Sequence, residues 1–520
     1  MMPLWILVVL LTFSYSGAHK ILVVFPLPEQ SHSILGARFV RHLLNYGHEV
    51  TYITPFVEKY THPNQQQVDV SRNLKLIPEN PVNLSSLMSK EVLAPGFTET
   101  MNFMNLVAVQ TLENENVQKL LKNPNLEFDL VILEWNFSEL LTGIAAVLDV
   151  PYIWVSNLEP HWLITRLAGE SFNPIFNSNI LSPYIPPLNL YQRVEELWTQ
   201  ITFHFHIYWN NDRIQRNNYE RFFGDIIRMK GREPPLFEEL KRNGSFVLGN
   251  SHLALGHDLR FPNNYRNVGG YHVDEEVKPL SPKLEKLMNN AADGVIYFSM
   301  GSKLKSEDFP VDIKKGLMKM FGELKQTVLW KLDDKSIDPP SNVHIFKRLP
   351  QQSLLAHSNC VVFITHGGIL STIEAVHYGV PIIGIPAYGD QFLNIERLVR
   401  KDQAKRVDLS HSLVADLKYA IDELLSTKRY NDTAKNNSFI FTHRTVNAGA
   451  EIVHWVEHVI LTKGAKYLRT ENLDLHWYQK LYLDLGLLLI SAFLFLTYSC
   501  KLFLSFISKT RKVDVKKKKK

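Results

Sequence analysis

Residues 361–391 contain two short apolar runs separated by a helix-like stretch. Residues 361–364 are apolar throughout and are predicted to form a buried parallel strand, and residues 381–385 a second one. Between them we expect a helix over about residues 370–377. This order predicts a doubly wound α/β domain, in which ligands lie outside the carboxyl ends of the strands.

Polar residues follow both of these strands. His366 ends the first, and two glycines then open the helix, where free backbone N–H groups suit a diphosphate. Glu374, about two turns later, could accept hydrogen bonds from ribose hydroxyls. Asp390 and Gln391 follow the second strand, and an acceptor beside an amide suits adjacent sugar hydroxyls. Each residue alone also fits a structural role, but their joint spacing favours a nucleotide-sugar site.

The segment resembles the signature of the UDP-glycosyltransferase family, which has these residues in the same order at the same intervals. Similar motifs extend over nearly the whole chain, at residues 297–302 (YFSMGS), residues 349–351 (LPQ) and Ser31-His32. The chain resembles animal members, particularly those of insects. The resemblance implies the α/β GT-B fold, with two doubly wound Rossmann-like domains facing a cleft.

The resemblance also implies a donor site for UDP-sugar. Its residues are Ser302, Arg348, Gln351, His366, Gly368, Ser371, Glu374, Asp390 and Gln391. In the family, Ser302, His366 and Ser371 would hold the diphosphate and Glu374 the ribose, while Asp390 and Gln391 would bind the sugar.

Two residues of this chain depart from the family pattern. Arg348 stands where the family usually has a Trp that stacks on uracil, and Asp402 where it usually has Gly. A guanidinium plane can also stack, so we expect uridine recognition with altered affinity. A residue other than Gly at position 402 is expected to distort the turn after the donor loop.

Strands and helices alternate along the rest of the body. The first half has predicted strands at residues 20–26, 49–54, 128–133, 152–156 and 246–249, with a helix at residues 31–46. Residues 273–284 are acidic, contain prolines and form the best linker candidate. We therefore predict an acceptor-binding domain over residues 19–272 and a UDP-sugar-binding domain over residues 285–470.

Transfer to a hydroxyl group is helped by a base, because the pKa of such a group lies far above neutral. His32, in the loop after the first predicted strand, is the candidate, since imidazole titrates near physiological pH. The resemblance implies a carboxylate on its far nitrogen, and Glu134 stands where the family has Asp. Asp129 is disfavoured because it begins the same strand, at the wrong end of the sheet. A capping role for His32 and a structural role for Glu134 stay open as alternatives.

Residues 171–223 are irregular and rich in aromatic side chains. Most of these rings are predicted to belong to the core, although some could line an apolar acceptor pocket. The rings in question are Trp198, Phe203, Phe205, Tyr208 and Trp209.

The hydrophobic ends of the chain predict its compartment. Residues 1–18 have an apolar stretch before a small-residue cleavage pattern and are predicted to be a signal peptide. Residues 484–507 are long and apolar enough for a transmembrane helix, for which a buried core helix is the alternative. The basic residues 508–520 favour a cytosolic tail, so a single-pass type I protein would keep its body in the lumen.

The last lysines look like the di-lysine signal of endoplasmic-reticulum membrane proteins, or else form a membrane-attracted basic tail. Five glycosylation sequons are compatible with a lumenal body. They begin at Asn83, Asn136, Asn243, Asn431 and Asn436.

The net charge of +5 arises from the C-terminal tail. Residues 509–520 carry +7, so the remaining chain sums to −2 and has no basic stripe for nucleic acid. We find no convincing metal-ligand cluster, and no cofactor is expected beside the co-substrate UDP-sugar. Cys360 begins a buried strand and Cys500 lies in the predicted span, so they are not expected to pair.

These observations predict a UDP-glycosyltransferase of the endoplasmic-reticulum membrane that serves in detoxification. It would transfer a hexose, glucose by association with insect members, to hydroxyls of small lipophilic acceptors with inversion. Its partners would be UDP-sugar, the acceptor and the membrane, and self-association into a homo-oligomer is left open. The alternatives are a noncatalytic carrier with the same fold and a glycosyltransferase for one membrane lipid.

Overall fold

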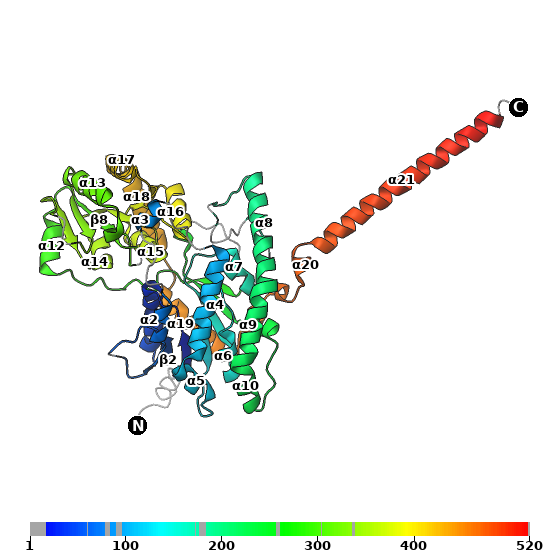
Figure 1. The fold of residues 1–520 in the computed structure, drawn as a ribbon, viewed down its shortest axis with the longest axis horizontal. Coiled ribbons are helices and arrows are strands. Elements are labelled where there is room, and N and C mark those ends of the chain that lie inside the picture. The colour runs from blue at the N-terminus through cyan, green and yellow to red at the C-terminus, as the bar shows by residue number, and fades with distance from the viewer. Residues whose placement is uncertain are drawn as a thin grey trace, which may run out of the picture.

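Two fully parallel sheets form the centres of two α/β halves in the computed structural model of the chain (Figure 1). The strand orders are β3-β2-β1-β4-β5-β6-β7 and β10-β9-β8-β11-β12-β13. In each sheet the order reverses beside the first strand of that half, so both halves are doubly wound, as predicted. The structure describes residues 17–517 except residues 60, 78–83, 90–95, 172, 176–181, 183, 256–260, 303 and 335–337.

The central strands of the first sheet are mostly apolar and almost entirely buried, because helices cover both of its faces. The strands are β1 (Lys20–Val24), β2 (Glu49–Thr54), β3 (Gln65–Asp69), β4 (Leu130–Glu134), β5 (Tyr152–Ser156), β6 (Phe246–Gly249) and β7 (Tyr265–Asn267). All five strands predicted in this half are present. The two edge strands β3 and β7 were not predicted, because they are short and polar.

Helices α2 (Gln30–Asn45) and α19 (Ala448–Leu461) pack on one face of the first sheet. The helices on the other face are α4 (Phe97–Glu113), α5 (Glu115–Lys122), α6 (Thr142–Leu148), α7 (Trp162–Thr165) and α11 (Phe237–Leu240).

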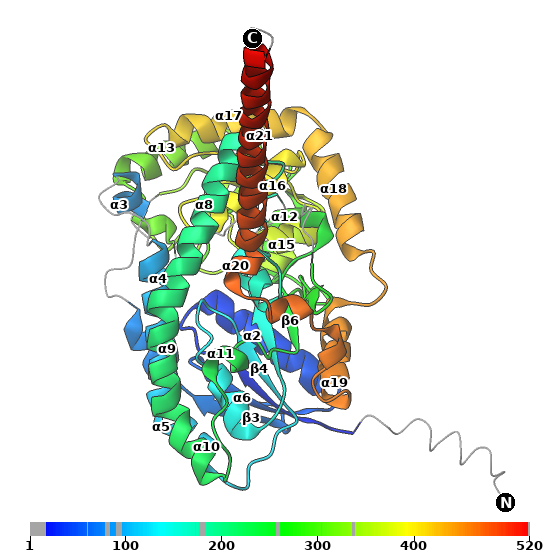
Figure 2. The ribbon, with the colours of Figure 1, turned by 90° about the vertical axis from the view of Figure 1, so that its right-hand side faces the viewer.

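One long helical segment runs along the outside of this second layer (Figure 2). It consists of α8 (Leu190–His206), α9 (Asp212–Tyr219) and α10 (Asp225–Met229), which π-helical turns at Ile207–Asn211 and Glu220–Gly224 join.

The prediction that most of the five rings singled out in residues 171–223 belong to the core is wrong. Trp198, Tyr208 and Trp209 expose 67%, 53% and 60% of their surface, and Phe203 and Phe205 are only partly buried. An apolar stripe on a helix has the same sequence pattern whether another element covers it or not.

The second half is built in the same way. Its strands are β8 (Val295–Ser299), β9 (Thr327–Lys331), β10 (Val343–Phe346), β11 (Cys360–Thr365), β12 (Ile382–Gly384) and β13 (Ala404–Arg406). One face is covered by α13 (Val311–Gly322) and α17 (Leu413–Ser426). The other is covered by α12 (Pro282–Asn289), α14 (Gln351–Leu355), α15 (Ile369–Tyr378) and α16 (Gln391–Arg400). α18 (Arg429–Thr442) packs beside α15.

The two halves exchange helices. α19 follows the whole second sheet in the chain, yet Ile452, Val453 and Val456 pack in the core of the first. Conversely, α3 (Leu84–Met88) lies within the first half of the chain but packs in the core around the second sheet. The predicted domain boundaries stay predictions, but residues 285–470 do not all pack around the second sheet.

The C-terminal helix projects from the body (Figures 1 and 2). After the short α20 (Trp477–Lys480), α21 (Leu483–Lys517) contains a segment, Leu483–Ser508, that is long and apolar enough to cross a membrane, with mean hydropathy 2.0 and no burial. Cys360 and Cys500 are both free, as predicted.

Four of the five predicted sequons lie in described parts of the chain. Asn243, Asn431 and Asn436 are exposed and Asn136 is half-buried. Asn83 lies outside the described residues, as does the predicted signal peptide up to residue 16.

Candidate active site

His32 and Glu134 meet at the carboxyl ends of two neighbouring strands. β1 pairs with β4, so the segments that follow these strands emerge at the same edge of the first sheet. His32 Nδ1 lies 2.5 Å from Glu134 Oε1, and only 2% of Glu134 is exposed. A proton on Nδ1 that is donated to the carboxylate makes Nε2 the acceptor position of the neutral ring.

The structure corrects one detail and confirms another. His32 belongs to the first turn of α2 and not to a loop. Asp129 precedes β4 at the opposite end of the sheet, where its carboxylate accepts a hydrogen bond from the backbone N–H of Lys20 (2.8 Å). Asp129 therefore lies at the wrong end of the strand to reach His32.

Asn157 is a third member of this cluster that the sequence interpretation missed. Its Nδ2 donates to Glu134 Oε1 and lies 3.1 Å from His32 Nδ1. Asn157 follows β5, which pairs with β4, so the rule that ligand-binding residues follow the carboxyl ends of parallel strands would have located it. The amide fixes the carboxylate that orients the imidazole.

His366 follows β11 and lies against two glycines of the second half. A Cβ on Gly301 would lie 2.5 Å from His366 Cε1, and one on Gly368 would lie 2.6 Å from its Nε2. Burial and the nearby Lys331 lower the pKa of His366 to about 4, so the ring is neutral at physiological pH. Lys331 Nζ donates to the Gly301 carbonyl (2.8 Å), which places a cation beside His366 that sequence reasoning did not identify.

Gly301→Ala should weaken UDP-sugar binding by about 10²-fold, because the new methyl group displaces the His366 ring. The matched control is Gly47→Ala: Gly47 has φ +89° against +91° for Gly301, but its Cβ would meet nothing within 4 Å. Both variants carry the same backbone strain, and only the first touches the imidazole. Calorimetric binding of UDP and thermal melting check this, and equal affinity in the two variants would contradict it.

Glu374 lies in a network of amide side chains. Its Oε2 accepts from Gln351 Nε2 (2.6 Å) and its Oε1 from Gln352 Nε2 (2.9 Å). Gln351 also donates to Ser371 Oγ (3.1 Å). Three of the residues predicted for the UDP-sugar site are therefore linked through Gln351. Burial raises the pKa of Glu374, although the two amide bonds lower it. A carboxylate has about four acceptor positions, so two remain for further hydrogen-bond donors.

Buried histidines next to this site predict acid instability. His161 and His272 expose 1% and 0% of their surface, and burial lowers the pKa of each to about 3. Below pH 6.5 the unfolded chain binds protons that the folded chain does not, so the free energy of unfolding should fall by up to about 1.4 kcal/mol per pH unit for each. Thermal melting between pH 7.5 and 5 should show a weaker decline for His161→Phe than for the exposed control His411→Gln.

Asp390 and Gln391 stand where β12 leads into α16. Asp390 Oδ2 accepts from Asn394 Nδ2 (2.7 Å). Gln391 Oε1 accepts from the backbone N–H of Ala387 (2.9 Å), which leaves its amide nitrogen to donate. Burial raises the pKa of Asp390, whereas the Asn394 bond and the charge of His32 lower it. α16, which begins at Gln391, also reaches the first half, because its Arg397 lies 3.5 Å from Glu159, two residues after Asn157.

Three further residues considered in the sequence analysis are Ser302, Arg348 and Asp402. Ser302 and Arg348 lie at exposed positions. Asp402 adopts φ +55°, which lies in the left-handed region that a Gly would favour there.

Two basic residues of α16, and Lys401 directly after it, reach from the second half of the chain to the first. Arg397 Nη1 lies 3.5 Å from Glu159 Oε2, and the two side chains expose only 5% and 2% of their surface. Arg400 donates to the carbonyl of Pro186 and Lys401 to that of Ala254, both at 2.8 Å. The helix that begins at Gln391 is thus attached along its C-terminal end to the first half.

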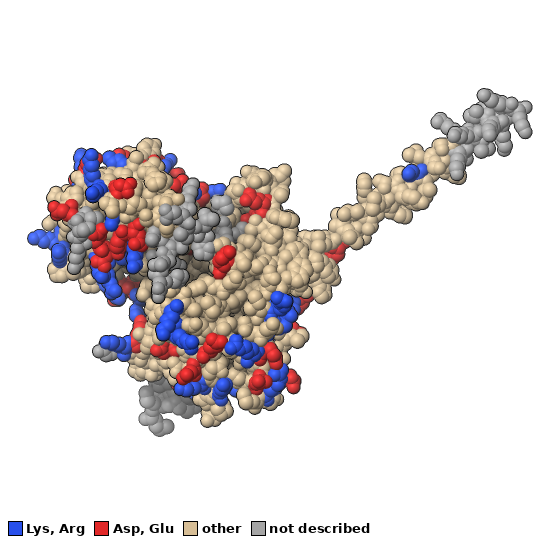
Figure 3. Space-filling view, in the orientation of Figure 1, with Lys and Arg blue, Asp and Glu red and all other residues tan. Residues whose placement is uncertain are grey.

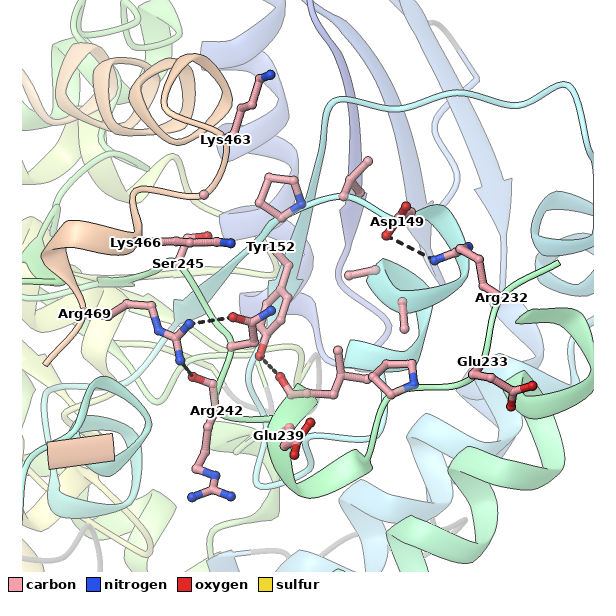
Figure 4. A pocket seen from close by; sticks show the side chains of 18 of the residues that line it. Asp149, Tyr152, Arg232, Glu233, Glu239, Arg242, Ser245, Lys463, Lys466 and Arg469 are labelled. Atoms are coloured by element: carbon pink, nitrogen blue, oxygen red, sulfur yellow. Dashed lines mark hydrogen bonds and ion pairs between the residues drawn. The ribbon is translucent and has the colours of Figure 1, made fainter. Parts of the chain in front are cut away.

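A cavity of about 630 Å³ lies at the opposite end of the first sheet, beside the start of β5 (Figure 4). Arg232 pairs with Asp149 (3.1 Å), and Arg469 donates to Asn243 Oδ1 (2.6 Å). Both arginines thus bind other residues of the fold, and the cavity is remote from His32. Within the described ranges, no group of three or more His, Cys, Asp or Glu could hold a metal ion.

Comparison with known proteins agrees with the geometry. Residues 19–520 match the model of the family described as UDP-glucoronosyl and UDP-glucosyl transferase. UDP-glucosyltransferase 2 of Dactylopius coccus is 32% identical over 501 residues, which cover 94% of each chain. UDP-glucuronosyltransferase 2B1 of Rattus norvegicus is 26% identical over 542 residues, covering 99% of this chain and 98% of its own.

Solved structures show the same fold. The glycotransferase of kitacinnamycin has a TM-score of 0.57 at 16% identity, over 85% of this chain and all of its own. A UDP-glucosyltransferase from Polygonum tinctorium has a TM-score of 0.56 at 15% identity, over 86% and 99%. These neighbours have the GT-B fold, in agreement with the two facing Rossmann-like halves seen here. The chain belongs to the family of UDP-glucuronosyl and UDP-glucosyl transferases.

Proposed function

We propose that this UDP-glycosyltransferase moves glucose from UDP-glucose to hydroxyl groups of small lipophilic acceptors, inverting the anomeric carbon. The observation that carries the proposal is the contact of His32 with the buried carboxylate of Glu134, 2.5 Å away. Asn157 lies beside this pair, and Glu159, two residues later, contacts Arg397 of α16, the helix that begins at Gln391. A base held in this way would serve a sugar bound at the start of α16.

In the proposed reaction, His32 Nε2 takes the proton of the acceptor hydroxyl as its oxygen attacks the anomeric carbon. The bond from that carbon to the diphosphate oxygen breaks in the same step, and UDP leaves with the electron pair. The imidazolium that forms is stabilised by Glu134, whose second interaction with Asn157 keeps it in place. The N-terminus of α15 and the neutral His366 would stabilise the leaving diphosphate. The proposal needs no metal ion and no cofactor.

Glucose is proposed as the sugar because the similar Dactylopius coccus protein is named a glucosyltransferase. The rat relative is named a glucuronosyltransferase, and the pair of Asp390 and Gln391 suits hydroxyls that both sugars carry. Donor choice is therefore part of the test.

We also propose that α21 anchors the protein in the endoplasmic-reticulum membrane, with the body in the lumen and the basic tail in the cytosol. The apolar segment Leu483–Ser508 and the lysines that follow it support this orientation. Exposed sequon residues Asn243, Asn431 and Asn436 are compatible with it. A detoxifying role would follow from acceptors that partition into the same membrane.

The test uses microsomes that contain the full chain or its His32→Ala variant. Each is incubated with labelled UDP-glucose or UDP-glucuronic acid and a panel of phenols and aliphatic alcohols, and the product anomer is determined by NMR. Transfer of glucose to several acceptors with inversion, abolished in the variant, supports the proposal. Equal product from both proteins would reject His32 as the base.

The same panel tests the alternatives. Bound UDP-glucose without product from any acceptor would indicate a carrier. Transfer to a single membrane lipid and to no soluble acceptor would indicate a lipid glycosyltransferase.

A further inference from the structure

Exposed apolar side chains form a stripe along α8 and the π-helical turn after it. We call this set, whose members expose 37–73% of their surface, the α8 stripe: Leu190, Tyr191, Val194, Leu197, Trp198, Tyr208 and Trp209. Their spacing of three and four residues places them on one face of the helix. Contiguous exposed apolar surface of this kind marks an interaction site more often than a free surface.

The α8 stripe is continuous with the base of α21. Phe205 stacks on Trp209, with ring centres 4.9 Å apart, and contacts Trp477 of α20 edge-on at 5.9 Å. Trp477, Tyr478 and Tyr482 add exposed aromatic rings at 39%, 40% and 63%. The surface around the base of α21 is accordingly almost free of Lys, Arg, Asp and Glu (Figure 3).

The segment before α20 is firmly attached to the first half. Arg242 Nη1 donates to the carbonyl of Leu473 (3.2 Å), a residue that is 1% exposed. Arg469 Nη2 donates to the carbonyl of Arg242 (2.9 Å), and Lys480 Nζ to that of Leu473 (3.4 Å). The chain therefore enters α21 from a fixed point, and the α8 stripe keeps its position beside that point.

We propose that the α8 stripe and the exposed rings of α20 lie in the headgroup region of the bilayer that α21 crosses. Trp and Tyr are the side chains that prefer this depth, and the Trp209 end of the stripe lies beside α20, directly before the span. The bilayer lies next to the α8 stripe in every molecule that α21 anchors, whereas a second copy of the chain would have to diffuse to it. The inner face of α8 packs Phe203 on Phe97 (3.7 Å), so this helix stands between the bilayer and the core of the first half.

This inference rests on the proposed membrane span, and the experiment separates the two. The full chain is placed in phosphatidylcholine nanodiscs, and single cysteines carry an environment-sensitive fluorophore. Trp198→Cys and Trp209→Cys in a Cys500→Ser background report on the stripe, since Cys360 is buried. Tyr419→Cys is the matched control, because Tyr419 is 69% exposed and lies on α17 of the second half. The wild-type chain labelled at Cys500 reports on the span.

Brominated lipids quench a fluorophore that touches them. We expect labels at positions 198 and 209 to be quenched at least about twofold more than the label at 419 by lipids brominated near the headgroup, as for an interfacial helix. We expect the label at Cys500 to be quenched by lipids brominated deep in the chain. Thermal melting verifies that each labelled protein is folded.

The other outcomes overturn the inference in distinguishable ways. If Cys500 is quenched but positions 198 and 209 behave like 419, the span is real and the docking surface is not. If Cys500 is not quenched by any lipid, the membrane span itself fails. The third outcome is a blue shift in the emission of the labels at positions 198 and 209 without lipid quenching. If this shift increases with the number of chains per nanodisc, a second copy covers the α8 stripe.

Discussion

Glu134→Gln should lower kcat by about 10²–10⁴-fold, the range over which general acid–base help is lost, while the KM for UDP-sugar changes little. Gln keeps the size of the side chain and an oxygen for His32 Nδ1, which lies 2.5 Å from the carboxylate in the wild type. It removes the negative charge that stabilises the imidazolium in the transition state. Steady-state kinetics with saturating acceptor measure the effect.

Two further variants show whether the charge is the cause. Glu134→Asp keeps the charge on a shorter side chain, so it should recover part of kcat if the backbone can bring the carboxylate to His32. Asp129→Asn changes a carboxylate at the opposite end of the sheet and should leave kcat unchanged. A Glu134→Gln enzyme with wild-type kcat would mean that the carboxylate is structural.

Arg397→Met should destabilise the protein by about 3–5 kcal/mol, the usual cost of removing one partner from a buried ion pair. Met has a similar length but no charge, so it leaves Glu159, 2% exposed, without its cationic neighbour. Ser251 Oγ still donates to Glu159 Oε2 (2.7 Å) but carries no charge to balance it. Denaturant unfolding of the full chain in detergent measures the loss.

The same helix provides the control. Arg400→Met removes an exposed guanidinium that donates to the Pro186 carbonyl, and it should cost less than about 1 kcal/mol. Because α16 begins at Gln391, Arg397→Met should also raise the KM for UDP-sugar, which Arg400→Met should not. The double variant Arg397→Met with Glu159→Gln should recover much of the stability, since neither charge is then buried alone. Equal losses in the two single variants would contradict the role of the buried pair.

Much of the fold follows from local sequence pattern. The apolar runs that became β1, β2, β4, β5 and β6 were recognisable because a strand covered on both faces is apolar at most positions. The edge strand β3 (QQQVD) carries no such signal, since solvent reaches it. The family resemblance assigned Gln351, Ser371 and Glu374 to one site, and Gln351 is hydrogen-bonded to both of the others.

What could not be predicted depends on partners far apart in the sequence. Arg397 and Glu159 are 238 residues apart, and nothing near either residue indicates the other. Asn157 is an ordinary polar residue until β5 is placed beside β4. The rings of the α8 stripe have the spacing of a core helix, and only the arrangement of the other elements shows that none of the described residues covers them.

The return of α19 to the first sheet determines the order in which the protein can be completed during synthesis. The last strand of that sheet ends at Asn267, but the helix that closes one of its faces ends at Leu461. About 190 residues must be translated in between, which takes roughly 10–40 s at 5–20 residues per second. Throughout that interval the apolar face that Ile452, Val453 and Val456 will cover is open on the nascent chain. The first half thus leaves the ribosome with part of this face uncovered until α19 has been made.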